Sequence, residues 1–332
     1  MNARQHELLG QGDLRFRADP DWLQLPADVN FVEAIGVAVD SQDRVFIFNR
    51  GDPPIIVVSP AGQFVDAWGD GEFQRPHGVT VVDDTLFLTD DIGHAVHQYS
   101  LDGERLRSIG PAGTPAETGV VGFDHRQITA GGPPYNLPTN VAVDAGGEIF
   151  VSDGYGNSRI HRFAANGELL RSWGGPGSGR GEFLVPHGVA VDRDGRVFVA
   201  DRENNRVQIF DGDGEWLTEW TDVVRPCDFA ILDDLVYIAE LGNQNGLFPW
   251  QSRPATPTGG RVSIYNLDGQ LLSRWGGGLD ARRVDGFYAC HDIAVDATGN
   301  VYVGEVAITA ATNAGEPTAG LPTLRKFDRV AS

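Results

Sequence analysis

The chain has 332 residues, with 26 Lys and Arg against 46 Asp and Glu, and its formal net charge is −20. A field of this sign repels nucleic-acid phosphates and anionic membrane surfaces, so neither is expected as a partner. The 43 Gly and 19 Pro residues, without any long run of helical periodicity, indicate an all-β protein of many short strands joined by turns.

The N-terminus shows no targeting signal. Residues 1–7 lack the apolar segment of a signal peptide, and no stretch approaches the roughly 18 apolar residues of a membrane span. Cys227 and Cys290 are far apart and form no CxxC pattern, which indicates neither a thiolate zinc site nor a disulfide framework. We therefore expect a soluble, cytoplasmic, monomeric protein, whereas a leader trimmed from this sequence would indicate secretion.

One pattern of four strands recurs along the chain. Each unit opens on Pro-x-Gly or a variant, has a first strand ending in Asp and a second ending in Asp, Asn or Glu, and closes near Trp-Gly. In chain order the six units run over residues 36–69, 76–110, 138–174, 186–220, 226–276 and 290–327. Their spacing of about 40 residues is typical of propeller repeats, so we predict a six-bladed β-propeller that forms a single domain over residues 1–332. The repeat resembles the NHL type.

Two features modify the simple repeat. Residues 111–137, 243–260 and 306–322 are insertions between recognisable strands. The sixth unit lacks a fourth strand, and Leu14–Arg17, within residues 1–30, is expected to supply it. This pairing would close the ring and remove the exposed edge strand that an open ring would keep.

Histidine occupies one position of the repeat in alternate units. The residue just before the Gly, Asn or Asp of each first strand is, from unit one to unit six, Ile35, His77, Thr139, His187, Cys227 and His291. Alternate blades of a six-fold ring are about 120° apart, so three imidazoles would point inward at one level. Such a set suits catalytic zinc with an open fourth position. The alternative is three channel-lining side chains hydrogen-bonded to water. The other five histidines are interpreted as surface or strand residues: His6, His94, His97, His125 and His161.

Polar loops are expected to surround these histidines, because neighbouring strands are antiparallel and each second strand ends where the first begins. The loops carry Arg50, Tyr155 and Arg202. The arginines are candidates to bind a carboxylate, and a tyrosine beside zinc would have a lowered pKa and could act as general base. The alternative for each is a loop residue that caps a turn or pairs with a surface acid.

Asp292 follows the third histidine, whereas Gly78 and Gly188 follow the other two. A carboxylate here favours a hard cation with backbone carbonyls as co-ligands. The equally weighted alternative is a hydrogen bond to exposed backbone amides.

Several segments together resemble peptidyl-α-hydroxyglycine α-amidating lyase (peptidylamidoglycolate lyase), the second catalytic unit of the peptide-amidating enzyme. They are Val45–Asp52, the two Pro-His-Gly segments, Val151–Arg159, Ala200–Asn204 and His291–Asp292. The resemblance covers roughly residues 30–330. It implies a zinc-dependent carbon–nitrogen lyase that splits an N-acyl or peptidyl α-hydroxyglycine into an amide and glyoxylate.

The resemblance also implies a role for individual residues. The matching positions are His77, His187 and His291 for zinc, Tyr155, Arg50 and Arg202 for catalysis, and Asp292 with the backbone carbonyls of Val37 and Val79 for a structural calcium. In that chemistry the phenolate of Tyr155 takes the substrate's hydroxyl proton, Arg50 steadies the carboxylate or the developing charge, and Arg202 tunes Tyr155.

The sequence departs from the family pattern at two places. Gly156 stands where the family has a disulfide-forming Cys, and Ala289-Cys290 replaces a Met-Pro pair before the third histidine. The inserted loops are also long, above all 111–137, and loops that cover the mouth would select a different acyl group. We therefore expect either a small N-acyl or N-alkyl hydroxyglycine or a peptide as substrate.

Two other functions compete with the lyase. The first is a non-catalytic NHL-type propeller that serves as a binding platform and holds no metal. The second is a calcium-dependent lactonase or related propeller hydrolase, whose sites depend on Glu, Asn and Asp ligands rather than three His.

Overall fold

The computed structural model describes residues 7–244, 246–248, 250–251 and 254–330. It contains six antiparallel sheets, five with four strands and one with five. These are the blades of an all-β six-bladed propeller, as predicted. Two compact units share them: unit 1 comprises residues 1–68 and 227–332, and unit 2 comprises residues 69–226.

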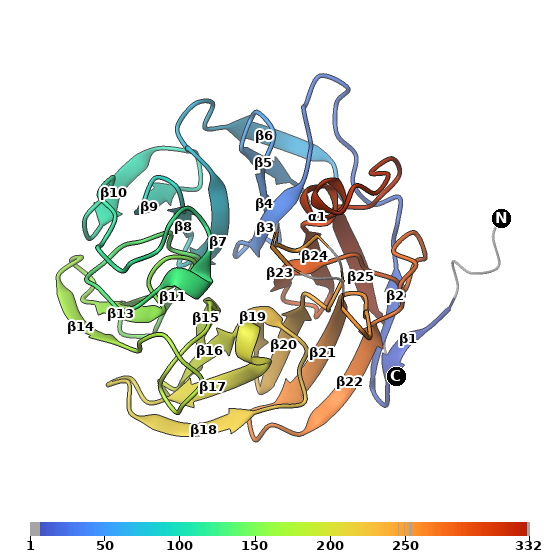
Figure 1. The fold of residues 1–332 in the computed structure, drawn as a ribbon. Coiled ribbons are helices and arrows are strands. Elements are labelled where there is room, and N and C mark those ends of the chain that lie inside the picture. Colours follow the sequence, from blue (N-terminus) through green and yellow to red (C-terminus); the bar gives the residue numbers. More distant parts are fainter. Residues whose placement is uncertain (1–6, 245, 249, 252–253, 331–332) are drawn as a thin grey trace. The chain divides into compact units, whose positions relative to one another are not determined.

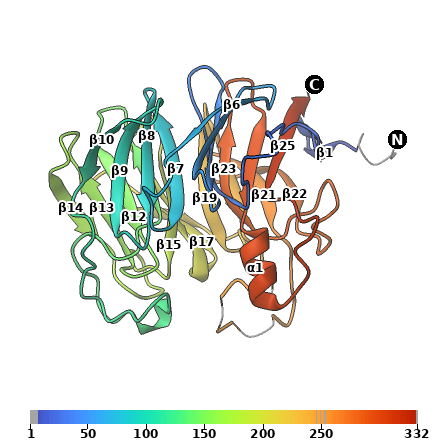
Figure 2. The same cartoon turned by 90° about the horizontal axis from the view of Figure 1, so that it is seen from above.

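Unit 2 holds the second, third and fourth blades. In chain order the blades are β7 (Pro76–Val82), β8 (Thr85–Asp90), β9 (Ala95–Ser100) and β10 (Arg105–Ile109); β11 (Asn140–Val143), β12 (Ile149–Asp153), β13 (Arg159–Phe163) and β14 (Leu169–Trp173); and β15 (Pro186–Val191), β16 (Val197–Asp201), β17 (Arg206–Phe210) and β18 (Trp216–Trp220). Two short 3₁₀ helices, η2 (His125–Gln127) and η3 (Arg202–Asn204), lie in the connections. The insertion 111–137, which includes η2, extends past the strand ends (Figure 2).

Unit 1 holds the first, fifth and sixth blades. They are β3 (Ala34–Val39), β4 (Val45–Asn49), β5 (Ile55–Val58) and β6 (Phe64–Trp68); β19 (Pro226–Leu232), β20 (Leu235–Glu240), β21 (Arg261–Asn266) and β22 (Leu271–Gly276); and β23 (Cys290–Val295), β24 (Val301–Glu305), β25 (Leu324–Val330), β2 (Leu14–Ala18) and β1 (Leu9–Gln11). Helix α1 (Ala307–Ala314) lies in the 306–322 insertion, at one end of this unit's strands (Figure 2).

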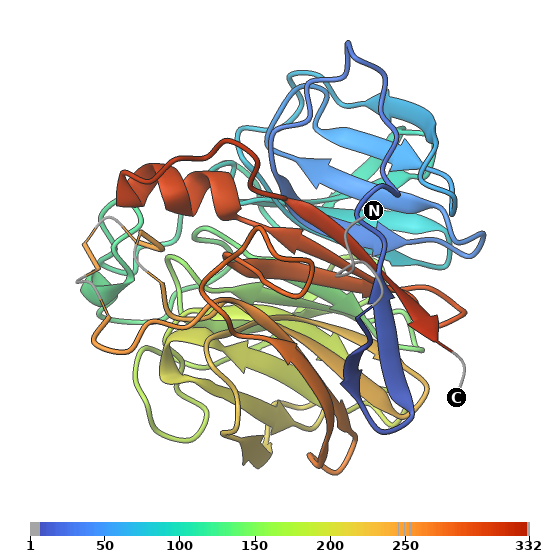
Figure 3. The ribbon, with the colours of Figure 1, turned by 90° about the vertical axis from the view of Figure 1, so that its right-hand side faces the viewer.

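The N-terminal segment completes the sixth blade, as predicted. β2 pairs antiparallel with β25 from Arg15 opposite Val330 to Ala18 opposite Phe327. The blue N-terminal strands therefore lie beside the red C-terminal ones (Figures 1 and 3). β1 adds a fifth strand that was not predicted, because its three residues carry too short a pattern to recognise.

The cores lie between neighbouring blades of each unit. Second strands are buried along their length, as in β4 and β16. Fourth strands are less buried, and β14 and β18 are exposed at most positions. In unit 2, Phe150 and Trp173 of one blade pack with Val199 and Phe210 of the next. Because the second strands are buried on both faces, they appear in the sequence as unbroken apolar runs.

The Asp that ends the first strand has a local structural function. In four blades its Oδ1 accepts two backbone N–H groups of the following turn, from the residues two and four positions later. The residues are Asp40, Asp144, Asp192 and Asp296. An Asp side chain that bonds its own turn in this way stabilises the hairpin, which accounts for this part of the repeat.

Removing the ring of Phe16 should loosen the closing sheet. Phe16 is fully buried and stacks on Trp275 with ring centroids 4.8 Å apart. Phe16→Ala should lower the free energy of unfolding by about 3–5 kcal/mol, measured by chemical denaturation. Arg17→Ala, on the exposed face of the same strand, is the control and should change it little. Equal stability of the Phe16 variant and wild type would contradict this role.

Candidate functional site

In the three blades that carry the histidines, the acid that ends the second strand holds the segment leading into the first strand. Asp90 accepts N–H groups of Gln74 and Arg75 at 2.7 and 2.9 Å, ahead of His77. Asp201 accepts Leu184 N–H at 2.8 Å. Glu305, the equivalent acid in the sixth blade, accepts the N–H group of Tyr288 in the same way. These bonds place the three histidines at corresponding points of their blades.

In unit 2, Tyr155 lies between two histidines. Its hydroxyl oxygen is 3.3 Å from His77 Nε2 and 3.1 Å from His187 Nε2. The two imidazole centroids are 4.9 Å apart, and all three side chains are buried. His77 Nδ1 lies 2.7 Å from the carbonyl oxygen of Thr139, which only accepts, so Nδ1 carries the proton and Nε2 the lone pair. A histidine oriented by a carbonyl in this way is a typical metal ligand.

Arg202 approaches the same hydroxyl. Its Nη1 donates to Tyr155 Oη at 3.3 Å, and its guanidinium carbon lies 5.3 Å from the Tyr155 ring centroid. The Arg202 side chain is only 2% exposed. The structure therefore brings together four residues that the sequence predicted: His77, His187, Tyr155 and Arg202.

His291, in unit 1, repeats the orientation of His77. It is buried, and its Nδ1 lies 2.8 Å from the carbonyl oxygen of Ile35. Glu305 accepts Tyr288 N–H at 2.7 Å, and this bond holds the entry to β23. Each of the three histidines is thus buried and could contribute to a metal site.

Asp292 faces a second buried carboxyl group, Asp228, in unit 1. Burial and this neighbour raise the pKa of Asp292 well above its usual range. Its Oδ1 accepts Ile293 N–H at 2.6 Å, and the backbone of Val37 also bonds it. Asp292 thus makes the backbone hydrogen bonds that were the alternative interpretation, and its part in a cation site stays a prediction. Val79, on β7 of unit 2, is buried.

Arg50 is held in unit 1 by a glutamate and by the helix of an insertion. Its Nη1 lies 3.5 Å from Glu33 Oε2 and donates to Thr309 Oγ1 at 3.3 Å. Thr309, in α1, donates its N–H to Glu33 Oε1 at 2.9 Å. A buried glutamate thus connects this candidate arginine to the 306–322 insertion.

The insertion 111–137 packs against the tyrosine loop of its own unit. Thr118 Oγ1 donates to the carbonyl of Gly156, and the Phe123 ring meets Tyr155 edge-on at 6.1 Å. A Cβ added at Gly156 would lie 2.4 Å from Asn136 Oδ1. Glycine is therefore required here because the insertion occupies the space that a larger side chain would need.

Sequence reasoning missed four residues around this group: Phe123, His125, Glu203 and Arg225. His125 was interpreted as a surface or strand residue, but it is buried in η2. Desolvation lowers its pKa to about 4, with Glu203 and Arg202 among the charges that act on it. Of these four residues, only Glu203 could have been found from the sequence, because it directly follows Arg202 in the chain.

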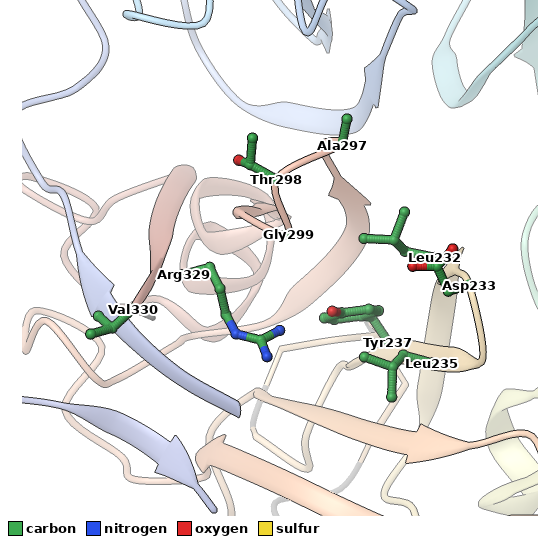
Figure 4. A pocket seen from close by; sticks show the side chains of 9 residues that line it. All are labelled: Leu232, Asp233, Leu235, Tyr237, Ala297, Thr298, Gly299, Arg329 and Val330. Carbon is green, nitrogen blue, oxygen red and sulfur yellow. The ribbon is translucent and has the colours of Figure 1, made fainter. Parts of the chain in front are cut away.

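A separate cavity of about 440 Å³ lies in unit 1 near the turns that follow β19 and β23. Figure 4 shows Tyr237 and Arg329 facing its interior. These turns are at the opposite ends of their strands from Cys227 and His291, so the cavity is distinct from the histidine positions. In the part of the chain that the structure describes, no helix has the length and apolarity needed to span a membrane.

Comparison with known proteins places the chain among NHL-repeat propellers. The NHL repeat family model matches residues 135–163 and 183–210. Two solved structures share the fold: a gluconolactonase from Xanthomonas campestris (TM-score 0.59, 14% identity, 98% of this chain and 93% of that one) and a streptogramin B lyase (TM-score 0.57, 11% identity, 98% and 99%).

Sequence similarity is more specific. A probable peptidyl-α-hydroxyglycine α-amidating lyase of Caenorhabditis elegans is 33% identical over 76% of this chain and 67% of its own length. The chain therefore belongs to the peptidyl-α-hydroxyglycine α-amidating lyase family. Peptidyl-glycine α-amidating monooxygenase B of Xenopus laevis is 29% identical over 91% of this chain, and NHL repeat-containing protein 3 of Homo sapiens is 35% identical over 56% of it. The chain spans 35% and 54% of the lengths of these two relatives.

Proposed function

We propose that this protein is a lyase that cleaves the C–N bond of an N-acyl α-hydroxyglycine and releases an amide and glyoxylate. One observation carries the proposal: the Tyr155 hydroxyl lies within hydrogen-bond distance of His77, His187 and Arg202, all inside unit 2. A proton acceptor beside metal-binding nitrogens and a fixed positive charge suits removal of a hydroxyl proton.

We further propose that His77, His187 and His291 bind one zinc ion. The donor set fits, because the three buried imidazoles occupy one repeat position and two of them direct Nδ1 to a backbone carbonyl. When bound, zinc would supply Lewis-acid polarisation of a substrate oxygen. By the family resemblance, Asp292 and the carbonyls of Val37 and Val79 would hold a structural calcium, and oxygen donors suit that ion.

The protein's own residues then account for the reaction. The Tyr155 phenolate takes the proton of the substrate's hydroxyl group, and the electrons of that O–H bond form the aldehyde C=O as the C–N bond breaks. The departing nitrogen takes up the proton that Tyr155 removed, which completes the amide and restores the phenolate. The hydrogen bond from Arg202 to Tyr155 favours the phenolate before the proton is taken. Arg50 would hold the substrate's carboxylate.

Glyoxylate release from α-hydroxyhippurate by the purified, zinc-loaded protein tests this proposal, with a panel of lactones assayed in parallel. We expect glyoxylate and benzamide in equal amounts and no lactone hydrolysis. Lactone hydrolysis without glyoxylate would instead support the hydrolase. No turnover together with no stoichiometric metal would support the binding platform.

A further inference from the structure

The Arg202 guanidinium, which donates to Tyr155, is supported by neighbouring charged side chains. Arg202 Nε donates to Glu203 Oε1 at 2.9 Å, while Nη1 of the same guanidinium donates to Tyr155 Oη at 3.3 Å. Because a guanidinium is planar and rigid, a bond that holds Nε also sets the direction of Nη1. The Glu203 bond therefore aims the donor that meets the tyrosine.

Glu203 is itself held from a second side. The same Oε1 accepts Arg225 Nη2 at 2.6 Å and Nε at 3.2 Å. The side chains of Arg225 and Glu203 are 5% and 16% exposed. The Arg225 backbone is fixed in turn, because its N–H donates to Asn205 Oδ1 at 3.0 Å. The carboxylate thus lies between two guanidinium groups.

The charge count of this cluster explains why both arginines stay in place. Two guanidinium groups and one carboxylate leave one positive charge, since burial keeps His125 neutral above a pKa of about 4. The arginines hold the pKa of Glu203 below its usual value despite burial. Without the carboxylate, two like charges would repel each other in a desolvated space, where such repulsion is strong.

The backbone ties the same residues to a candidate metal ligand. Arg202 N–H donates to the carbonyl of Val185 at 3.2 Å, and Glu203 N–H donates to that of Leu184 at 3.0 Å. Residues 184–185 lead directly into β15, which carries His187. Backbone hydrogen bonds therefore join the residues that support Arg202 to the entry of His187.

We propose that Glu203 is a positioning residue that holds the Arg202 guanidinium against the Tyr155 hydroxyl, with Arg225 fixing its carboxylate. The inference rests on the proposed function, because it assigns Glu203 an effect on the residue that takes the proton. The charges of Glu203 and Arg202 act on His125, so the 111–137 insertion lies next to this pair of residues.

Glu203→Asp tests the proposal, because it keeps the charge but shortens the side chain by one methylene. The shorter carboxylate cannot hold both guanidinium groups in their present positions. We expect kcat for α-hydroxyhippurate to fall about tenfold or more, with KM little changed. The surroundings of the Tyr155 hydroxyl should also change, so the ¹⁹F chemical shift of Tyr155 in fluorotyrosine-labelled protein should move. Tyr155→Phe assigns the signal.

A double-mutant cycle with Arg202→Met separates positioning from general support of the fold. If Glu203 acts through Arg202, Glu203→Asp should have no further effect on kcat or on the ¹⁹F chemical shift of Tyr155 in the Arg202→Met background. Effects of equal size in both backgrounds would overturn the proposal. So would a Glu203→Asp protein with the wild-type kcat and the wild-type ¹⁹F shift of Tyr155.

Control experiments separate the positioning role of Glu203 from a folding defect and from the proposed lyase function. Glu219→Asp shortens a glutamate of the same unit whose arginine partner, Arg206, lies 3.0 Å away, and it should leave both readouts unchanged. If Glu203→Asp does not fold, Glu203→Gln, which keeps the side-chain length, replaces it in the same cycle. The ¹⁹F spectrum of Tyr155 is recorded without substrate. A shift that depends on Arg202 in a protein that releases no glyoxylate would therefore refute the proposed function but not the positioning role.

Discussion

Tyr155→Phe is expected to lower kcat for glyoxylate release by about 10²- to 10⁴-fold, the usual contribution of a positioned general base. The variant removes one oxygen atom and keeps the ring, which meets Phe123 edge-on. KM should change little, because binding of the substrate's carboxylate is assigned to arginine. Steady-state kinetics with α-hydroxyhippurate measures both parameters.

A matched variant tests whether the effect comes from the position of the Tyr155 hydroxyl or from loss of any buried hydroxyl. Tyr135 is another buried tyrosine of unit 2, and its hydroxyl donates to the carbonyl of Ile109 at 3.0 Å. Tyr135→Phe should cost about 1 kcal/mol of stability and leave kcat unchanged. Metal content should stay at the wild-type value in both variants. Full activity of Tyr155→Phe with metal bound would exclude the tyrosine as the base.

His77→Ala is expected to remove stoichiometric metal from the purified protein and to abolish lyase activity. Loss of one imidazole leaves two of the three proposed ligands, and the affinity for zinc should fall by orders of magnitude. Elemental analysis gives the metal content, and thermal unfolding gives the stability. Metal that binds only the folded protein stabilises it by about 2.7 kcal/mol at a free concentration of 100 Kd, so the variant should also lose the response of its melting temperature to zinc.

His161→Gln is the control for this experiment. His161 is a buried histidine of the same unit, but its ring nitrogens meet Ser172 Oγ at 2.7 Å and Asp153 Oδ2 at 3.1 Å. Its replacement should lower stability without lowering metal content. Wild-type zinc content in His77→Ala would rule out the three-histidine site.

The histidine positions could be predicted because they depend only on the register of the repeat. One position in the first strand recurs in each blade, and local bonds keep it there: the acid that ends the second strand holds the entering segment, and Asp192 and its equivalents hold the next turn. Tyr155 and Arg202 follow second strands, so antiparallel pairing was enough to place them beside His187.

The support around Arg202 could not be predicted in the same way. Phe123 and His125 reach it through the path of the 111–137 insertion, which has no repeat to define it. Arg225 directly precedes the next blade, and its contact with Glu203 depends on the shape of two connections. Gly156 was visible as a departure from the family, but its reason, the position of Asn136, is a tertiary contact.

The sheet that joins β2 to β25 also bears on how the chain folds during its synthesis. β2 is made well before its partner β25, so until β25 has been made Phe16 can pair only with β1. Contacts between such distant residues form slowly because a very long loop must close. Blades complete within their own residues can form earlier, during translation. The sixth blade is therefore expected to assemble last, and until then the nascent chain has an exposed apolar edge that chaperones would recognise.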